Sequence, residues 1–304
     1  MSLLAMLKPN GKSGFGYGST AEDVTANVDL TGKFVVLTGC NSGLGKECLR
    51  VLGLRGAYVA ALARTEAKAQ AALDDTGTQG IAVACELSDP VSVRAAVARV
   101  LQEGRPVDRV LCNAGIMALP QLETAHGYEL QFFTNHIGHF LLVTGLLDHL
   151  ADDARVVLTS SGAHQMAPKG GIEFDNLDGS QGYTPIRAYG QSKMANILFA
   201  MGLAKRFEGS ERVANAVHPG VIATNLGRSM SSVANVVMRI ASPLVMKNAA
   251  QGAATQMFAA FHDDGARWSG EYLSDCNLDK ARDDATEELA ERLWQTSEAI
   301  ASDV

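Results

Sequence analysis

The sequence lacks any long hydrophobic run. None of its 304 residues lies in a stretch of eighteen uninterrupted apolar positions, and the apolar segment 3–7 is too short to form the core of a signal peptide. We therefore expect neither a transmembrane anchor nor a secretory leader. The sequence predicts a soluble protein.

An excess of positive charge is also missing. Lys and Arg number 26 and Asp and Glu number 33, which gives a net charge of −7 with neutral histidines. Proteins that bind nucleic acid need clustered basic side chains to replace the phosphate counterions. We therefore expect no nucleic-acid partner.

The five cysteines form no Cys-x-x-Cys pair, and no histidine lies at zinc-ligand spacing from any of them. We interpret them as reduced core thiols, which favours a cytoplasmic protein. His136 and His139 lie three residues apart in a predicted helix, but no carboxylate or third histidine is suitably placed. The sequence therefore predicts no metal site.

From residue 33 onward, short continuous apolar runs alternate with longer amphipathic segments. Continuous runs are typical of parallel strands that are buried on both faces. The predicted strands are 34–37, 58–62, 81–84, 109–112, 156–158 and 213–217, and the predicted helices are 43–55, 65–74, 90–103, 124–150 and 187–208.

This alternation predicts an α/β fold. We expect a doubly wound Rossmann fold, with a central, mostly parallel sheet flanked by helices, as a single domain over residues 30–304. Residues 1–29 begin with a short apolar segment and continue rich in Gly, Ser and Asn. They are predicted to form an extended N-terminal arm.

A glycine-rich loop follows the first predicted strand directly and precedes a helix. Gly39 allows a tight turn, Gly43 permits close approach to a pyrophosphate, and Gly45 lets the helix pack near the strand. The alternative is that these glycines are purely structural. The strand–loop–helix context favours a dinucleotide-binding loop.

The second predicted strand ends at Ala63-Arg64. A carboxylate there would accept hydrogen bonds from the ribose of NAD, whereas a cation favours the additional phosphate of NADP. Arg64 offers a fork of donors for that phosphate. The alternative is a solvated arginine near a helix start, and the residues favour NADP(H) over NAD.

Tyr189 and Lys193 lie four residues apart in a predicted helix and so share one face. An ammonium group beside a phenol favours the phenolate and would lower its pKa. We therefore interpret Tyr189 as a general acid/base for conversion between a carbonyl and an alcohol. Taken alone, the pair is equally compatible with a role in packing.

Several polar segments are predicted to meet at one edge of the sheet. Gly39, Asn113, Ser161 and Thr224 each follow a predicted strand, and the carboxyl ends of parallel strands line the ligand-binding edge. Tyr189 lies in the helix between two of these strands. The sequence therefore predicts an active site at this edge.

Together these motifs resemble the short-chain dehydrogenase/reductase family over about residues 30–300. The motifs are, in chain order, Thr38-Gly-x-x-x-Gly-x-Gly45, Asn113-Ala-Gly115, Asn135, Ser161, Tyr189-x-x-x-Lys193 and Pro219-Gly220 with Thr224.

The resemblance implies a catalytic tetrad. Tyr189 would exchange a proton with the substrate oxygen, Lys193 would lower its pKa and hold the nicotinamide ribose, Ser161 would orient the substrate oxygen, and Asn135 would support a water relay to Lys193. The implied cofactor-binding residues are Gly39, Asn41, Ser42, Gly43, Leu44, Gly45, Arg64, Glu86, Leu87, Asn113, Ala114, Gly115, Tyr189, Lys193, Ile222 and Thr224.

Within the family, the chain is similar to the branch that contains retinol dehydrogenases, the WW-domain oxidoreductase and light-dependent protochlorophyllide reductase. This similarity rests on residues 134–140, 161–164 and 270–276, and on the long spacing between Ser161 and Tyr189. Glu86-Leu87 stands where many relatives carry an aspartate for the adenine. Since no apolar run is long enough to span a membrane, we expect no membrane anchor of the kind that animal retinol dehydrogenases carry.

Segment 226–250 carries too many apolar residues for a one-sided surface helix. The resemblance implies that this region covers the substrate, so we predict an apolar lid. With Met117 and Met166 it points to a bulky hydrophobic substrate. The alternative is a contact with a membrane surface or with a second subunit.

The sequence therefore predicts an NADP(H)-dependent enzyme that interconverts an alcohol and a ketone or aldehyde. Two alternatives stay open, namely a carbon–carbon double-bond reductase of the same family and a catalytically silent NADP(H)-binding regulator. The expected partner is a small hydrophobic alcohol or carbonyl compound. The helix patterns are compatible with a homo-oligomer and do not distinguish a dimer from a monomer or tetramer.

Overall fold

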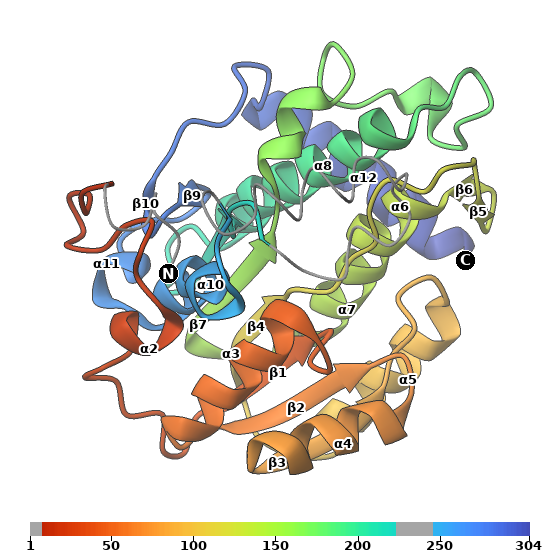
Figure 1. Cartoon of the computed structure of the whole chain (residues 1–304). Coiled ribbons are helices and arrows are strands. Elements are labelled where there is room, and N and C mark those ends of the chain that lie inside the picture. Colours follow the sequence, from red (N-terminus) through yellow and green to blue (C-terminus); the bar gives the residue numbers. More distant parts are fainter. Residues whose placement is uncertain (1–7, 223–245) are drawn as a thin grey trace.

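A central sheet of eight strands organises the computed structural model, which describes residues 8–222 and 246–304. The strand order is β10-β9-β8-β7-β4-β1-β2-β3, and every pairing is parallel except that of β10 with β9 (Figure 1). The strands are β1 (Phe34–Thr38), β2 (Tyr58–Ala63), β3 (Gly80–Ala84), β4 (Val107–Cys112), β7 (Leu150–Thr159), β8 (Val213–His218), β9 (Tyr272–Ser274) and β10 (Asn277–Leu278).

Helices cover both faces of the sheet, so the central strands β1 and β4 are buried along their whole length. Side chains at alternate positions of β1 separate accordingly: Phe34 and Val36 belong to one hydrophobic cluster, and Val35 and Leu37 to the other. The first face carries α5 (Pro90–Leu101), α7 (Gly138–Leu146), α8 (Pro185–Arg206) and α12 (Glu287–Asp303), and the second carries α2 (Ala21–Val24), α3 (Gly43–Leu54), α4 (Glu66–Thr76) and α10 (Ala249–Phe261).

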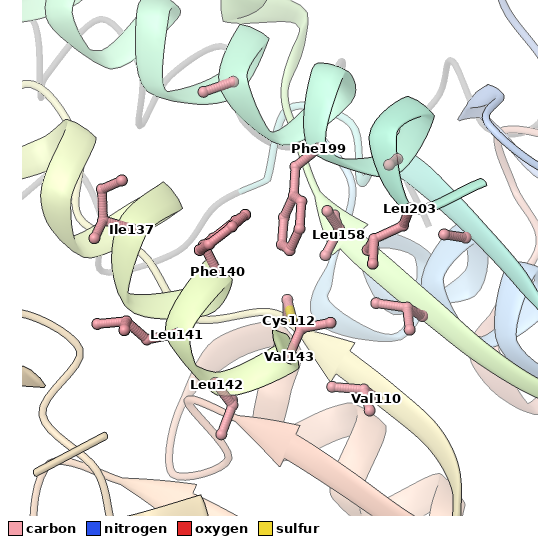
Figure 2. Packing of buried hydrophobic residues seen from close by; sticks show 14 of the residues in the cluster. Val110, Cys112, Ile137, Phe140, Leu141, Leu142, Val143, Leu158, Phe199 and Leu203 are labelled. Carbon is pink, nitrogen blue, oxygen red and sulfur yellow. The ribbon is translucent and has the colours of Figure 1, made fainter. Parts of the chain in front are cut away.

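Aromatic side chains fill the first of these clusters. Figure 2 shows Phe140 of α7 and Phe199 of α8 facing each other beside Cys112 of β4. Their ring centroids are 5.2 Å apart, and Trp294 of α12 packs edge-on against Phe140 with a centroid distance of 5.0 Å. This packing fixes α8, which carries the predicted proton donor, against α7 and the sheet.

The doubly wound fold is confirmed, and the six predicted strands lie within the observed ones. The predicted helix over 124–150 is wrong at both ends. It begins as a hairpin of β5 (Thr124–Ala125) and β6 (Tyr128–Glu129), continues through α6 (Leu130–Phe132), a π-helical turn (Phe133–Ile137) and α7, and ends before β7. Strands β9 and β10 were not predicted from the sequence.

The segment before the sheet is not simply an extended arm. Within it, α2 begins with a capping box in which Thr20 and Asp23 exchange hydrogen bonds, and Ala21 and Val24 are buried against the second face. Another helix of one turn, α11 (Asp263–Ala266), lies elsewhere in the chain, directly after α10. The amphipathic pattern of α2 is only one turn long, which explains why the sequence did not reveal it.

All five cysteines are buried free thiols, as predicted. In the described part of the chain, no helix is both long and apolar enough to span a membrane.

Candidate active site

The ends of β1 and β4 are tied together by a threonine. The Thr38 hydroxyl oxygen accepts hydrogen bonds from the backbone N–H groups of Asn113 and Ala114, at 2.9 and 3.0 Å. The Asn113 side-chain amide donates to the Thr38 carbonyl at 2.9 Å. This tie places the Asn113-Ala114-Gly115 segment beside the glycine-rich loop, as the sequence predicted. The role of the Thr38 side chain was missed.

The glycine-rich loop forms a tight backbone cradle. Gly39 has φ +69°, and a Cβ added to Gly45 would lie 2.1 Å from the Gly39 carbonyl oxygen. Asn41 and Ser42 are exposed in front of α3, whereas Leu44 and Gly45 are buried. The backbone of this loop therefore has no room for a side chain at Gly45.

The start of α3 is suited to an anion. Its N-cap residue, Ser42, makes no side-chain capping hydrogen bond, although the helix is twelve residues long. The first N–H groups of such a helix attract a phosphate because they lack intrahelical partners and lie at the positive end of the helix dipole. The observed cradle therefore fits the pyrophosphate of a dinucleotide.

Arg64 and Glu86 follow β2 and β3 at the same edge. Arg64 is exposed and forms no ion pair with any described residue. One carboxylate oxygen of Glu86 accepts hydrogen bonds from Ser88, through its hydroxyl at 2.9 Å and its N–H at 3.3 Å. The neighbouring Leu87 packs its carbonyl against Gly138. Glu86 thus stabilises its own loop, and its contact with adenine stays a prediction.

Tyr189, Ser161 and Lys193 come together in the structure. Tyr189 lies beside the Ser161 side chain, whose interaction with the phenol acts to lower the pKa of Tyr189. The Lys193 ammonium lies 5.5 Å from the centre of the Tyr189 ring and donates to the Thr159 carbonyl at 3.0 Å. The Ser160 hydroxyl donates to the Lys193 carbonyl at 2.8 Å, which fixes α8 against the end of β7.

Burial determines the protonation of this pair and corrects one sequence-based expectation. Burial raises the pKa of Tyr189 to about 12, which outweighs the interaction with Ser161, and lowers the pKa of Lys193 to about 8. The expected lowering of the Tyr189 pKa by Lys193 is therefore wrong for the chain alone. Both groups are deeply buried, so the loss of solvation outweighs their proximity.

Asn135 lies in the π-helical turn and holds the segment after Gly115. Its side-chain oxygen accepts from the Ile116 N–H at 2.8 Å, and its amide donates to the Ile116 carbonyl and to the Ser192 hydroxyl, both at 2.9 Å. A Cβ at Gly115 would lie 2.9 Å from the Asn135 oxygen and 3.4 Å from the Lys193 nitrogen. Gly115 therefore allows Asn135 and Lys193 to approach each other.

Two histidines support the Ser161 loop. His164 donates from Nδ1 to the Ser161 carbonyl at 2.7 Å, and His218 accepts at Nδ1 from the Gly162 N–H at 3.2 Å. Burial lowers the pKa of His218 to about 4. Both side chains act as hydrogen-bonding supports of this loop.

Part of the predicted site lies outside the described residues, namely Thr224 and the lid segment over 226–245. Ile222 is described and forms an isolated parallel bridge with Lys247. Met117 is half-buried and Met166 is exposed. Within the described ranges, no group of three or more His, Cys, Asp or Glu side chains is arranged to hold a metal ion.

Comparison with known proteins places this site in a family. The sequence profile of short chain dehydrogenases matches residues 33–174. Retinol dehydrogenase 12 of Mus musculus is 39% identical over 308 residues, which cover 98% of this chain and 94% of that protein. The chain belongs to the short-chain dehydrogenase family.

Further relatives of this short-chain dehydrogenase define its branch. The short-chain dehydrogenase TIC 32 B, chloroplastic, of Brassica napus is 38% identical over 302 residues, covering 94% of each chain. With the retinol dehydrogenases, it places the protein in the retinol dehydrogenase-like branch that the motifs predicted. The protein is accordingly an oxidoreductase of this family.

Solved structures of this family support binding of a nicotinamide cofactor. An uncharacterised protein from Mycobacterium paratuberculosis matches with a TM-score of 0.76 at 32% identity, covering 93% of this chain and 97% of that one. A short chain dehydrogenase from Burkholderia cenocepacia, solved in complex with NADP, matches with a TM-score of 0.65 at 25% identity, covering 81% and 96%.

Proposed function

We propose that this protein is an NADP(H)-dependent oxidoreductase that interconverts an alcohol and a ketone or aldehyde on a bulky, largely hydrophobic substrate. The observation that carries the proposal is the meeting of Tyr189, Ser161 and Lys193 at the sheet edge to which the open N-terminus of α3 belongs. A phenol, a hydroxyl and an ammonium group in that arrangement suit proton transfer at a carbonyl oxygen.

Each residue has a distinct role. Tyr189 exchanges a proton with the substrate oxygen, and Ser161 orients that oxygen by a hydrogen bond. Lys193, held by the Thr159 carbonyl, binds the cofactor ribose and places positive charge beside the phenol. Asn135 keeps the Ile116 backbone next to Lys193. The bound nicotinamide supplies or accepts the hydride.

The protonation of Tyr189 suits reduction at neutral pH. Because burial raises the pKa of Tyr189 to about 12, the phenol carries its proton and is ready to donate it to a substrate oxygen. Oxidation of an alcohol needs the deprotonated phenol. We therefore expect oxidation to require a higher pH than reduction.

Arg64 supports NADP(H) over NAD(H). It is exposed at the end of β2, where the additional phosphate of NADP would lie, and no described carboxylate neutralises it. One similar protein, from Burkholderia cenocepacia, was solved with NADP.

The apolar composition of segment 226–250 supports a bulky hydrophobic substrate. Similar proteins from mouse and human are named retinol dehydrogenases, after a long apolar alcohol. We therefore propose hydrophobic aldehydes and ketones as the first substrates to test.

The test is a product analysis. The purified protein is incubated with NADPH or NADH and with a panel of bulky aldehydes, ketones and conjugated enones, and the products are separated by chromatography. We expect alcohols to form with NADPH and at least ten-fold more slowly with NADH.

Each other outcome contradicts one part of the proposal. Loss of the alkene with the carbonyl retained would indicate a double-bond reductase. NADPH binding without turnover of any compound would indicate a silent cofactor-binding protein, and a preference for NADH would overturn the role of Arg64.

A further inference from the structure

His139 lies one turn beyond Asn135 at the start of α7 and takes no part in the proton transfer proposed above. Its imidazole is buried, and both ring nitrogens have partners at 2.9 Å. Nδ1 faces the carbonyl oxygen of Asn135, and Nε2 faces the hydroxyl oxygen of Thr38. The ring therefore spans the distance between the π-helical turn and the end of β1.

The direction of each hydrogen bond follows from the chemistry of the partners. A carbonyl oxygen only accepts, so Nδ1 of His139 carries a proton and donates it to Asn135. Burial lowers the pKa of His139 to about 4, so the ring is neutral at pH 7 and Nε2 is bare. The Thr38 hydroxyl must then donate to Nε2.

Thr38 in turn receives two hydrogen bonds. With its own proton directed at His139, the Thr38 oxygen keeps its lone pairs for the N–H groups of Asn113 and Ala114. One directed chain thus runs from the Asn113-Ala114 turn through Thr38 and His139 to the carbonyl of Asn135. It joins three segments that come from β1, β4 and the π-helical turn.

We propose that His139 is a positioning residue, whose neutral Nδ1–H tautomer holds Asn135 and the Asn113-Ala114 turn in fixed relation to each other. The catalytic part of this proposal rests on the proposed function. Asn135 holds the Gly115-Ile116 backbone, which lies against Lys193. Displacement of Asn135 would therefore shift Lys193 relative to Tyr189. Displacement of Thr38 instead breaks the hydrogen bonds that hold the Asn113-Ala114 turn beside the glycine-rich loop.

Two substitutions separate the two halves of the chain of hydrogen bonds. In His139→Asn the side-chain amide replaces Nδ1, which preserves a donor for Asn135 and removes the acceptor for Thr38. In His139→Gln the longer side chain reaches the place of Nε2, which preserves the acceptor and removes the donor.

His136 provides the matched control. It is buried in the same helical segment, but its Nε2 lies 2.8 Å from the Ser297 hydroxyl of α12, away from Thr38 and Asn113. His136→Gln therefore disturbs a buried histidine without touching the proposed chain of hydrogen bonds.

We expect the two variants to differ in kind. His139→Gln should lower kcat by about ten- to hundred-fold, as expected for a small misplacement of catalytic groups, with the dissociation constant of NADPH nearly unchanged. His139→Asn should chiefly raise that dissociation constant. Thr38→Val should raise it at least as much, because it also removes the acceptor of the Asn113 and Ala114 N–H groups, and the double variant His139→Asn/Thr38→Val should be no worse than Thr38→Val alone.

A second measurement does not depend on enzymatic activity. Nitrogen-15 NMR of the histidine-labelled wild-type protein at pH 7 should show His139 as the Nδ1–H tautomer, with the signal assigned by comparison with His136→Gln and the His139 variants that fold. An Nε2–H tautomer or an imidazolium at this position would overturn the proposal.

The kinetic outcome is equally decisive. If both His139 variants match His136→Gln in kcat and in NADPH affinity, His139 has no positioning role. If the wild-type protein binds NADPH but turns over no carbonyl compound, the proposed function fails, while the NADPH affinities and the tautomer still test the chain of hydrogen bonds.

Discussion

Tyr189 and Lys193, one helical turn apart, respond to burial in opposite directions. The phenol holds its proton more tightly and the ammonium less tightly than in water, because each is moved toward its neutral form. Their spacing could be predicted from the sequence because a helix brings positions four apart together. Their protonation could not, since it depends on the depth at which β7, α7 and α8 bury them.

At the same scale, Arg64 tests cofactor choice. Replacing it in Arg64→Gln should weaken NADPH binding by roughly ten- to hundred-fold, because a charge-assisted hydrogen bond is worth about 1.5–3 kcal/mol. NADH binding should stay the same, because NADH lacks the phosphate. Fluorescence titration of both cofactors measures this.

Arg267→Gln is the control, since Arg267 is an exposed arginine just after α11 that pairs with Asp264. Equal loss of NADPH and NADH affinity in Arg64→Gln would contradict a phosphate contact.

At the scale of elements, the sequence predicted the strands better than the helices that follow β4. Continuous apolar runs between turn residues define β1 to β4, β7 and β8, whichever partner they pair with. In segment 124–150 apolar residues occur throughout among polar ones, and this pattern does not distinguish one helix from a hairpin, a π-helical turn and a helix in series. His126 and Gly127, with φ of +51° and +83°, turn the hairpin.

The N-terminal segment, the residues before α10 and the turn between β9 and β10 meet at one ion cluster. Asp275 lies 2.6 Å from the Lys8 nitrogen and 2.8 Å from the Lys247 nitrogen, and the Lys247 side chain is only 1% exposed. Since Lys247 also bridges to Ile222, the cluster anchors the backbone that follows β8.

We predict that Asp275→Asn destabilises the fold by up to about 3–5 kcal/mol, because it leaves a buried ammonium without its counter-charge. Asparagine tolerates the left-handed conformation of Asp275, with φ +50°, so backbone strain is not introduced. Urea unfolding measures the change.

The control is Asp283→Asn, which breaks the exposed pair of Asp283 with Lys280 and should leave the unfolding free energy unchanged. If the two variants were equally stable, the ion cluster would have no anchoring role.

At the scale of the whole molecule, the order of strands and helices was enough to predict a doubly wound fold and the edge where ligands bind. The hydrogen bonds that fix the site were not predictable, because Thr38, Asn135 and Ser160 find their partners in segments far away in the sequence. Only the packing of the complete sheet brings these groups within reach.

The buried histidines should make the whole molecule sensitive to acid. Burial lowers the pKa of His136 to about 3 and the pKa values of His139 and His218 to about 4, below the value near 6.5 of the unfolded chain. Between these values the unfolded state binds more protons, so the free energy of unfolding must fall as the pH falls from 6.5 toward 4.

Urea unfolding at several pH values between 6.5 and 4.5 tests this prediction. The slope of the free energy of unfolding against pH gives the number of protons taken up on unfolding. Each of the three histidines should contribute up to about one proton to this number, and His136→Gln should remove the contribution of His136. A free energy of unfolding that is constant over this range would contradict the burial of neutral histidines.

The central claim is that the Tyr189 phenol transfers the proton in an NADP(H)-dependent reaction, and Tyr189→Phe tests it most directly. The rate of carbonyl reduction at saturating NADPH and the dissociation constant of NADPH are measured side by side for this variant and the wild type. The account predicts that kcat falls by at least about a hundred-fold, as expected when a general acid is lost, while NADPH binds as before. A phenylalanine variant that keeps the wild-type kcat would contradict it.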